Sequence, residues 1–356
     1  MIQKAVMVGW GILAWGFTAL AADDVVINEL NYNPYDDAPT EFVELYNPTS
    51  RVVDLSQYSF TDGIFFTFPA AAKINPGQYI IVVRYRNAAA WSEVSYPVYG
   101  PYIGDLADGG ELIRLRSTDG RVVDEVKYND VHPWSRGADG YGPSLERISP
   151  DLPSSDSHTW RSSLKSGTNP RTPGGSPGAK NTVDGIAPKP TLVSWSVNPP
   201  YPASKDKPRI DLILDGAERI DSVTVRAETV RESTVGTIKT YPMTLQKVEE
   251  DLAAYRTDLP TFTTQTLVRM SFNVQLVGGG SLSLPPVPEP RPFESFFVYD
   301  NEIPSQIPIL WFYPRISTKL TPSSTYAAGV VIKPVTLDHV LVYDGARIVD
   351  SRNGQK

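Results

Sequence analysis

Residues 41–63 read EFVELYNPTSRVVDLSQYSFTDG, two short strand-like segments joined by a polar turn and followed by a bend at Gly63. In the first segment Phe42, Glu44 and Tyr46 alternate with apolar side chains. Such alternation is typical of a β-strand, because successive side chains of a strand point to opposite faces of the sheet. The stretch therefore predicts two neighbouring strands in a sheet.

Similar segments recur up to about Trp160, including VVINELNY at 25–32 and ELIRLR at 111–116. QYIIVVRY at 78–85 is apolar on both faces, which indicates a strand covered on each side. STDGRVV at 117–123 carries an Asp-Gly pair typical of a hairpin turn. Without a useful helical periodicity, the pattern predicts an antiparallel β-sandwich over 22–164. We expect one core to contain Phe42, Val43, Leu45, Ile81, Val83, Ile113, Leu115 and Trp160.

Residues 165–190 are rich in glycine and proline and have few side chains to bury, so they predict a linker. A second series of alternating strands, such as LVRMSFNVQL at 267–276, predicts a smaller sandwich over 191–299. Residues 300–356 contain further strand-like segments and end shortly after an Asn-Gly pair, which we interpret as the start of a truncated third unit. The fold class is therefore all-β, with tandem β-sandwiches.

Composition limits the class of protein. The chain has 356 residues, a formal net charge of −7, and no run of lysine and arginine, so nucleic acid is not expected as a partner. It has no cysteine, which excludes disulfides and thiolate metal sites. Residues 1–21 combine Lys4, an apolar run and a small-x-small end at Ala21, as in a cleaved signal peptide. The alternative is an uncleaved anchor, but the apolar run is shorter than the roughly 20 residues of a spanning helix.

Several short motifs occur in one order: EFVELYNPTS, VDLSQYSFTDG, FTFPAAAKINPGQYIIVV and GELIRLRSTDGRVVDEVKY. Together with GADGYGPSLERISPD and TPGGSPGAKN, they make about residues 24–181 resemble the lamin-tail domain of exported bacterial proteins. This resemblance implies an immunoglobulin-like fold. Residues 191–299 more weakly resemble the immunoglobulin- or fibronectin-like module that often follows it. The region from Val298 on is similar to the lead-in of CotH-type spore-coat kinase-like proteins, which would place a catalytic domain beyond Lys356.

Catalytic motifs are not found in the sequence. His132, His158 and His339 are in separate regions and do not have a metal-ligand spacing, so each is expected at a surface or in a turn. Neither a nucleophile elbow nor a phosphate-binding glycine loop occurs. We therefore assign no catalytic residue in this chain, and we expect neither a cofactor nor a metal.

Carboxylates are the remaining chemical candidates. Two of Glu29, Glu41 and Glu44 on one face could act as acid and base or bind a hard cation, but the favoured alternative is structural, with Glu44 accepting hydrogen bonds. GDLADGGE at 104–111 lacks the order of a calcium loop. Asp124 indicates either a hydrogen-bonded buried acid, which we favour, or a β-bulge.

The loop VHPWSRGADGYGP at 131–143 is the candidate binding surface, with Trp134, Arg136, Asp139 and Tyr141 as its site residues. The alternative is that Trp134 and Tyr141 cap the end of the sandwich. We expect a secreted, periplasmic or cell-surface binding, adhesion or scaffolding protein with no catalytic site in this chain. Its partner would be a cell-surface or extracellular polymer or protein, and it would meet the membrane only through export. The alternatives are the accessory part of a CotH-type enzyme and a spacer.

Overall fold

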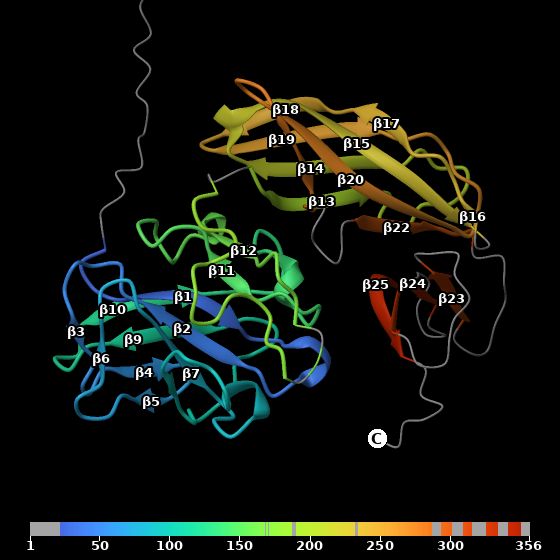
Figure 1. Ribbon diagram of the computed structural model, residues 1–356. Coiled ribbons are helices and arrows are strands. Elements are labelled where there is room, and N and C mark those ends of the chain that lie inside the picture. The colour runs from blue at the N-terminus through green and yellow to red at the C-terminus, as the bar shows by residue number, and fades with distance from the viewer. Residues whose placement is uncertain are drawn as a thin grey trace, which may run out of the picture.

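The computed structural model is built almost entirely from strands and loops (Figure 1). It describes residues 22–167, 169, 171–186, 190–231, 234–286, 293–300, 309–314, 325–333 and 341–349. The expected signal segment 1–21 and His339 lie outside these residues. Within them, the helices are five short 3-10 turns: η1 (Tyr35–Asp37), η2 (Ala89–Trp91), η3 (Arg136–Ala138), η4 (Ser157–Thr159) and η5 (Ala217–Arg219).

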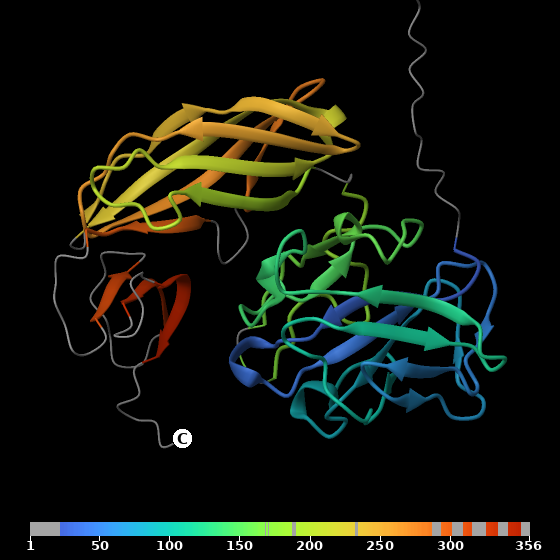
Figure 2. The same ribbon diagram turned by 180° about the vertical axis from the view of Figure 1, so that it is seen from behind.

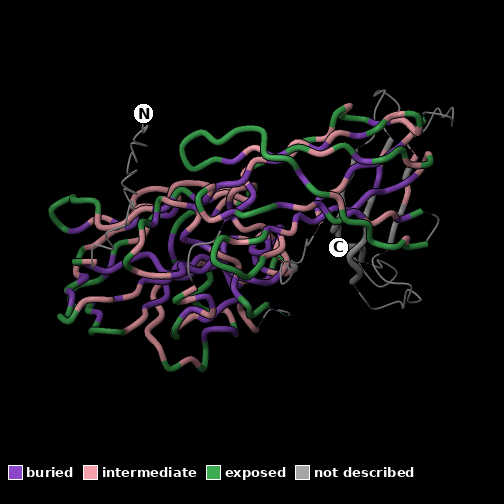
Figure 3. The backbone as a smooth tube through the Cα atoms, turned by 90° about the horizontal axis from the view of Figure 1, so that it is seen from above, coloured by how far each residue is buried: buried purple, intermediate pink, exposed green. Residues whose placement is uncertain are grey.

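The first sandwich consists of two main sheets. One has the order β12 (Trp160–Ser162), β11 (Leu145–Arg147), β1 (Val26–Asn31), β2 (Phe42–Tyr46), β7 (Tyr79–Val83), β8 (Val98–Tyr99). The other has the order β10 (Val122–Lys127), β9 (Leu112–Arg116), β4 (Ser59–Asp62), β5 (Phe66–Thr67). A small ladder pairs β3 (Val53–Asp54) with β6 (Lys73–Ile74). Buried residues gather between the layers, as Figure 3 shows.

Strand β2 lies in the middle of the larger sheet and is buried on both faces. Val43 and Leu45 face the core between the sheets, together with Ile113, Leu115 and Trp160. The alternate side chains face outward, where Phe42, Ile81 and Val83 form a second cluster with Trp91 of η2. The expectation of a single core was therefore wrong, because the period of a strand sends neighbouring side chains to opposite faces. The expectation of a doubly covered strand at β7 is confirmed.

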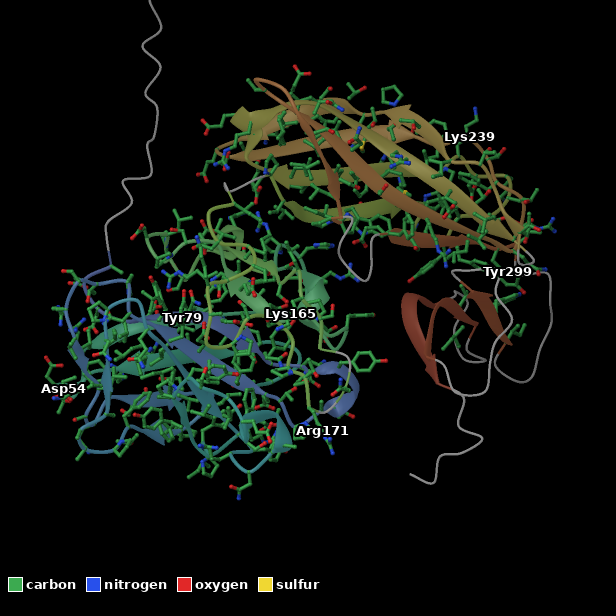
Figure 4. The ribbon with its side chains drawn as sticks, in the orientation of Figure 1. Asp54, Tyr79, Lys165, Arg171, Lys239 and Tyr299 are labelled. Carbon is green, nitrogen blue, oxygen red and sulfur yellow. The ribbon has the colours of Figure 1, made fainter. Side chains whose placement is uncertain are left out.

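Residues 171–186, here called the closing segment, were expected to be part of a linker. They instead lie against the outer face of the larger sheet, where the amide of Gly178 donates to Glu44 of β2 (2.7 Å), and the amide of Gly185 donates to the carbonyl of Ile148 just after β11 (2.8 Å). Lys165 and Arg171 both lie beside the first sandwich in Figure 4. A glycine-rich segment buries few apolar side chains, but its backbone amides can still be buried against acceptors.

The second sandwich has its own core. One sheet has the order β13 (Leu192–Asn198), β14 (Arg209–Asp215), β19 (Leu252–Asp258), β18 (Thr244–Glu249). The other has the order β16 (Thr234–Val235), β15 (Ile220–Arg231), β20 (Thr266–Leu276), β21 (Ser281–Leu284), while β17 (Lys239–Pro242) pairs with β15 and β22 (Glu294–Val298) pairs with β20. The alternation read from 267–276 is realised in β20, whose Val268, Met270 and Phe272 are buried in this core.

A third, separate sheet follows the second sandwich, and both Figure 1 and Figure 2 show it beside β22. Its order is β23 (Ile309–Pro314), β24 (Thr325–Lys333), β25 (Leu341–Val349). Val331 packs with Val230, Leu267 and Phe297 of the second sandwich in a small apolar cluster. Strands are therefore present in the region expected to begin a third unit.

Candidate binding site

A cavity of about 320 Å³ lies between the two sandwiches. The first sandwich contributes Trp134 and Arg136 from the loop after β10, and Leu164 from the segment that follows β12. The second contributes apolar side chains at the start of β13 and along β21, such as Leu192 and Leu282. Cavities of this size with mostly apolar walls and a few polar groups are typical of small-ligand sites, which often occur between domains.

The closing segment forms part of the cavity wall. Val183 and Ile186 line the cavity, and the amide of Val183 donates to Glu146 in β11 (3.2 Å). The position of these apolar side chains is therefore fixed by a hydrogen bond to the first sandwich. The part of the chain that sequence composition indicated as a linker is thus a structural component of the candidate site.

The four predicted site residues separate into two groups. Trp134 and Arg136 line the cavity, whereas Asp139 and Tyr141 do not. Trp134 is only 8% exposed, because its ring packs near that of Trp160 with 6.4 Å between centroids. Asp139 accepts a hydrogen bond from Asn33 (2.8 Å), and Tyr141 is half-buried. Trp134 and Tyr141 therefore do not form the exposed aromatic surface expected from the sequence, because the core takes up the Trp134 ring.

Arg136 joins the two sandwiches at one end of their interface. Its Nη1 lies 2.8 Å from Oε1 of Glu294 in β22, and His132 Nε2 lies 2.8 Å from the same oxygen. The other carboxylate oxygen of Glu294 accepts from Trp195 Nε1 at 2.7 Å. Burial alone would raise the pKa of Glu294, but the hydrogen bond from His132 and the charge of Arg136 hold it below its ordinary value. We call this group the Glu294 contact.

A second polar contact joins the sandwiches near β14. His158 of η4 approaches Asp156 through Nδ1 and Asp215 of the second sandwich through Nε2. Asp215 also accepts from the amide and hydroxyl of Thr191, at 2.6 and 2.5 Å. Burial tends to lower the pKa of His158, yet the hydrogen bond to Asp156 and the charge of Asp215 raise it above its ordinary value. We call this group the His158 contact.

These interdomain residues were missed by sequence reasoning. His132 and His158 were expected as isolated surface or turn histidines, but both are paired with carboxylates of the second sandwich. His132 and Glu294 are 162 residues apart in the chain, so no local spacing could indicate the pair. Only the three-dimensional arrangement of the two sandwiches brings them together.

The candidate carboxylates lie away from the cavity. Glu29 is the register partner of Glu44 in β2 and of Glu146 in β11, which brings three buried glutamates together. Glu41 is separate and accepts from Tyr102 Oη and from the amide of Leu106 (2.8 Å). Two of the three candidate glutamates, Glu29 and Glu44, are therefore neighbours, whereas Glu41 lies apart and Glu146 joins the pair.

The closing segment supplies donors to the three glutamates. The Gly178 amide donates to Glu44 (2.7 Å), and the Ser176 amide donates to Glu29 (3.1 Å). The Ser176 hydroxyl donates to Glu146 at 2.8 Å. Burial raises the pKa of Glu44 to about 8 and also raises the pKa of the other two. The structural interpretation of Glu44, as an acceptor of hydrogen bonds from a neighbouring loop, is confirmed.

The other acidic candidates also have structural partners. Asp124 accepts from the Ile27 amide (2.8 Å) and from Arg147 Nη1 (2.9 Å), and the β9–β10 register shifts beside it. It is thus both a hydrogen-bonded acid and a neighbour of a bulge. In the loop 104–111, Glu111 accepts from the Ala107 amide (2.8 Å). Among the described residues, no group of three or more His, Cys, Asp and Glu side chains is arranged to hold a metal ion.

Among the residues that the structure describes, no helix has the length and apolar character needed to cross a bilayer.

One comparison with known proteins matches the first part of the chain. Two listerial structures match over 42% of this chain: an uncharacterized protein of Listeria monocytogenes EGD-e in complex with glucose, magnesium and calcium (10% identity, TM-score 0.21), and a cycloalternan-forming enzyme of Listeria monocytogenes with a pentasaccharide substrate (9%, 0.22). The matches cover only 12% and 14% of those chains, and the scores are too low to establish a shared fold. No curated protein matches the chain. Residues 18–130 match the family model of the Lamin Tail Domain, which agrees with the immunoglobulin-like sandwich of β1 to β10.

Proposed function

We propose that this chain is an exported, modular binding and scaffolding protein that recognises its partner in the cavity between the two sandwiches. The partner is a cell-surface or extracellular polymer or protein that inserts a small apolar group. The protein is secreted, periplasmic or surface-bound, which rests on the signal-like residues 1–21. It carries out no catalysis of its own.

The cavity is the observation that carries this proposal. Its walls are mostly apolar, with side chains such as Leu164, Ile186 and Leu282. The charged groups that line it are Arg136 and Arg161, with His132 as a third basic group, and no carboxylate is among the described lining residues. Since Glu294 already pairs with Arg136 and His132, the apolar walls are what favour an apolar group of the partner.

A pair of leucine substitutions tests the proposal. Leu164 is 61% exposed and lines the cavity, whereas Leu252 is 43% exposed and lies elsewhere, in β19. Leu164→Glu should abolish retention of the full chain on cell-wall material and displace an uncharged naphthylamine probe from the cavity. Leu252→Glu, the matched control, should change neither. Equal retention of both variants would contradict the cavity as the binding site.

A second candidate function follows from the third sheet. We propose as the alternative that both sandwiches are the accessory part of a CotH-type kinase-like protein. The observation that favours it is β23–β25, a sheet that packs on the second sandwich through Val331. Incubation of this chain with radioactive ATP and Mg²⁺ or Mn²⁺ should transfer no phosphate to itself or to casein. Transfer would show that the chain itself is catalytic and would contradict both candidates as stated.

A further inference from the structure

The two polar contacts between the sandwiches differ in the number of hydrogen-bond donors that they need from histidine. Both ring nitrogens of His158 face carboxylates: Nδ1 faces Asp156 of its own sandwich, and Nε2 faces Asp215 of the other. Only the doubly protonated ring has two N–H donors. Neutral His158 can donate to one carboxylate, and its bare nitrogen then faces the oxygen of the other.

The Glu294 contact does not have this requirement. His132 approaches Glu294 through Nε2 alone, so the neutral tautomer with a proton on Nε2 keeps the hydrogen bond. Arg136 stays charged at any pH in the physiological range and remains 2.8 Å from the same carboxylate oxygen. Trp195 donates to the second oxygen whatever the pH.

We propose that the interface between the sandwiches is a pH-responsive joint, in which the His158 contact opens when His158 loses its proton while the Glu294 contact holds. The second sandwich then turns about the Glu294 contact. The cavity changes shape with it, because its lining includes His132 at one contact and Thr191 at the other. The joint does not depend on what the cavity binds.

The charges around His158 set the direction of the effect. The charges of Asp156 and Asp215 favour the protonated ring, and the charge of Arg161 in β12 opposes it. The negative charge of Asp251 raises the pKa of Asp215. The net effect is that the pKa of His158 is raised. The His158 contact therefore stabilises the interface fully below the ordinary histidine pKa, and this stabilisation is lost as the pH rises through the raised pKa of His158. When neutral His158 keeps its proton on Nδ1 for Asp156, the buried Asp215 is left with Thr191 as its hydrogen-bond donor among the described residues.

The test is a distance measurement in the full chain. Because the chain has no cysteine, Lys73→Cys and Glu249→Cys place one label on each sandwich at exposed positions. We expect a narrow distribution of label distances at about pH 6 and a broader one at about pH 9, on either side of the titration of histidine. His132→Gln is the matched control and should keep this change with pH.

Two variants make the assignment specific. His158→Gln should give the broad distribution at both pH values. Asp156→Ala should give the narrow one at both, because no carboxylate then faces the bare Nδ1 of neutral His158, which donates to Asp215 through Nε2. A parent distribution that is the same at both pH values would overturn the proposal, as would a change with pH that persists in His158→Gln.

Discussion

Replacement of Gly175 by alanine should destabilise the first sandwich by closing the space between the closing segment and the sheet. Gly175 has φ +78°, and a Cβ built there would lie 1.6 Å from Glu29 Oε1 and 2.1 Å from Ser144 Oγ. The left-handed backbone alone costs an alanine about 1 to 2 kcal/mol. If the segment moves away, the buried Glu29 loses the Ser176 amide, which costs about 1 to 3 kcal/mol more. The free energy of unfolding should therefore fall by about 2 to 5 kcal/mol.

Gly77 provides a matched control for this variant. It has φ +70°, and nothing lies within 4 Å of its built Cβ. The free energy of unfolding of Gly77→Ala should therefore fall only by the cost of the left-handed backbone, about 1 to 2 kcal/mol. Urea unfolding of the full chain, with amide hydrogen exchange at Ser176 and Gly178, measures both variants. Equal losses in the two variants, with unchanged exchange at Ser176, would refute the role assigned to the closing segment.

The same structure makes three further predictions. Leu45→Ala should cost about 2 to 5 kcal/mol because Leu45 is fully buried, and an unchanged melting curve would be inconsistent with the register of β2. Burial raises the pKa of Glu44 to about 8, so the stabilisation by its protonated form is complete at acid pH and is lost as the pH rises through that value. In urea titrations, the free energy of unfolding of Glu44→Gln should therefore rise relative to that of the parent between about pH 5 and 9, and parallel curves of stability against pH would contradict this. A fragment 22–186 should show the dispersed amide spectrum of a folded domain, whereas 22–164 should not, since it lacks the donors to the glutamates; a folded 22–164 would count against the closing segment.

The strands were predictable because their signal is local. Each of these signals lies within about ten residues: the alternation in β2, the alternation in β20, and the Asp-Gly turn before β10. A strand pattern can be recognised over this range. The division of the core in two was not foreseen. It depends on what covers the outer face of the larger sheet, and Trp91 of η2 comes from a distant loop.

The position of the closing segment against the sheet could not be predicted from the sequence for a different reason. Its composition correctly indicates few apolar side chains to bury, but that says nothing about backbone amides that meet buried acceptors. The acceptors are glutamates on β1, β2 and β11, more than a hundred residues away for Glu29 and Glu44. The aromatic and charged residues of the loop at 131–143 predict a binding surface, and two of its four predicted site residues line the cavity.

Closure of the first sandwich and construction of the candidate site depend on the same segment. Ser176 and Gly178 bind the glutamates of the sheet, and a few residues later Val183 both donates to Glu146 and lines the cavity. If these glutamates lose their hydrogen-bond donors, the closing segment would therefore detach both from the sheet of the first sandwich and from the wall of the cavity. Because the Glu146 hydrogen bonds set where Val183 lies, the first sandwich shapes the cavity from its own sheet outward, and the second sandwich completes it.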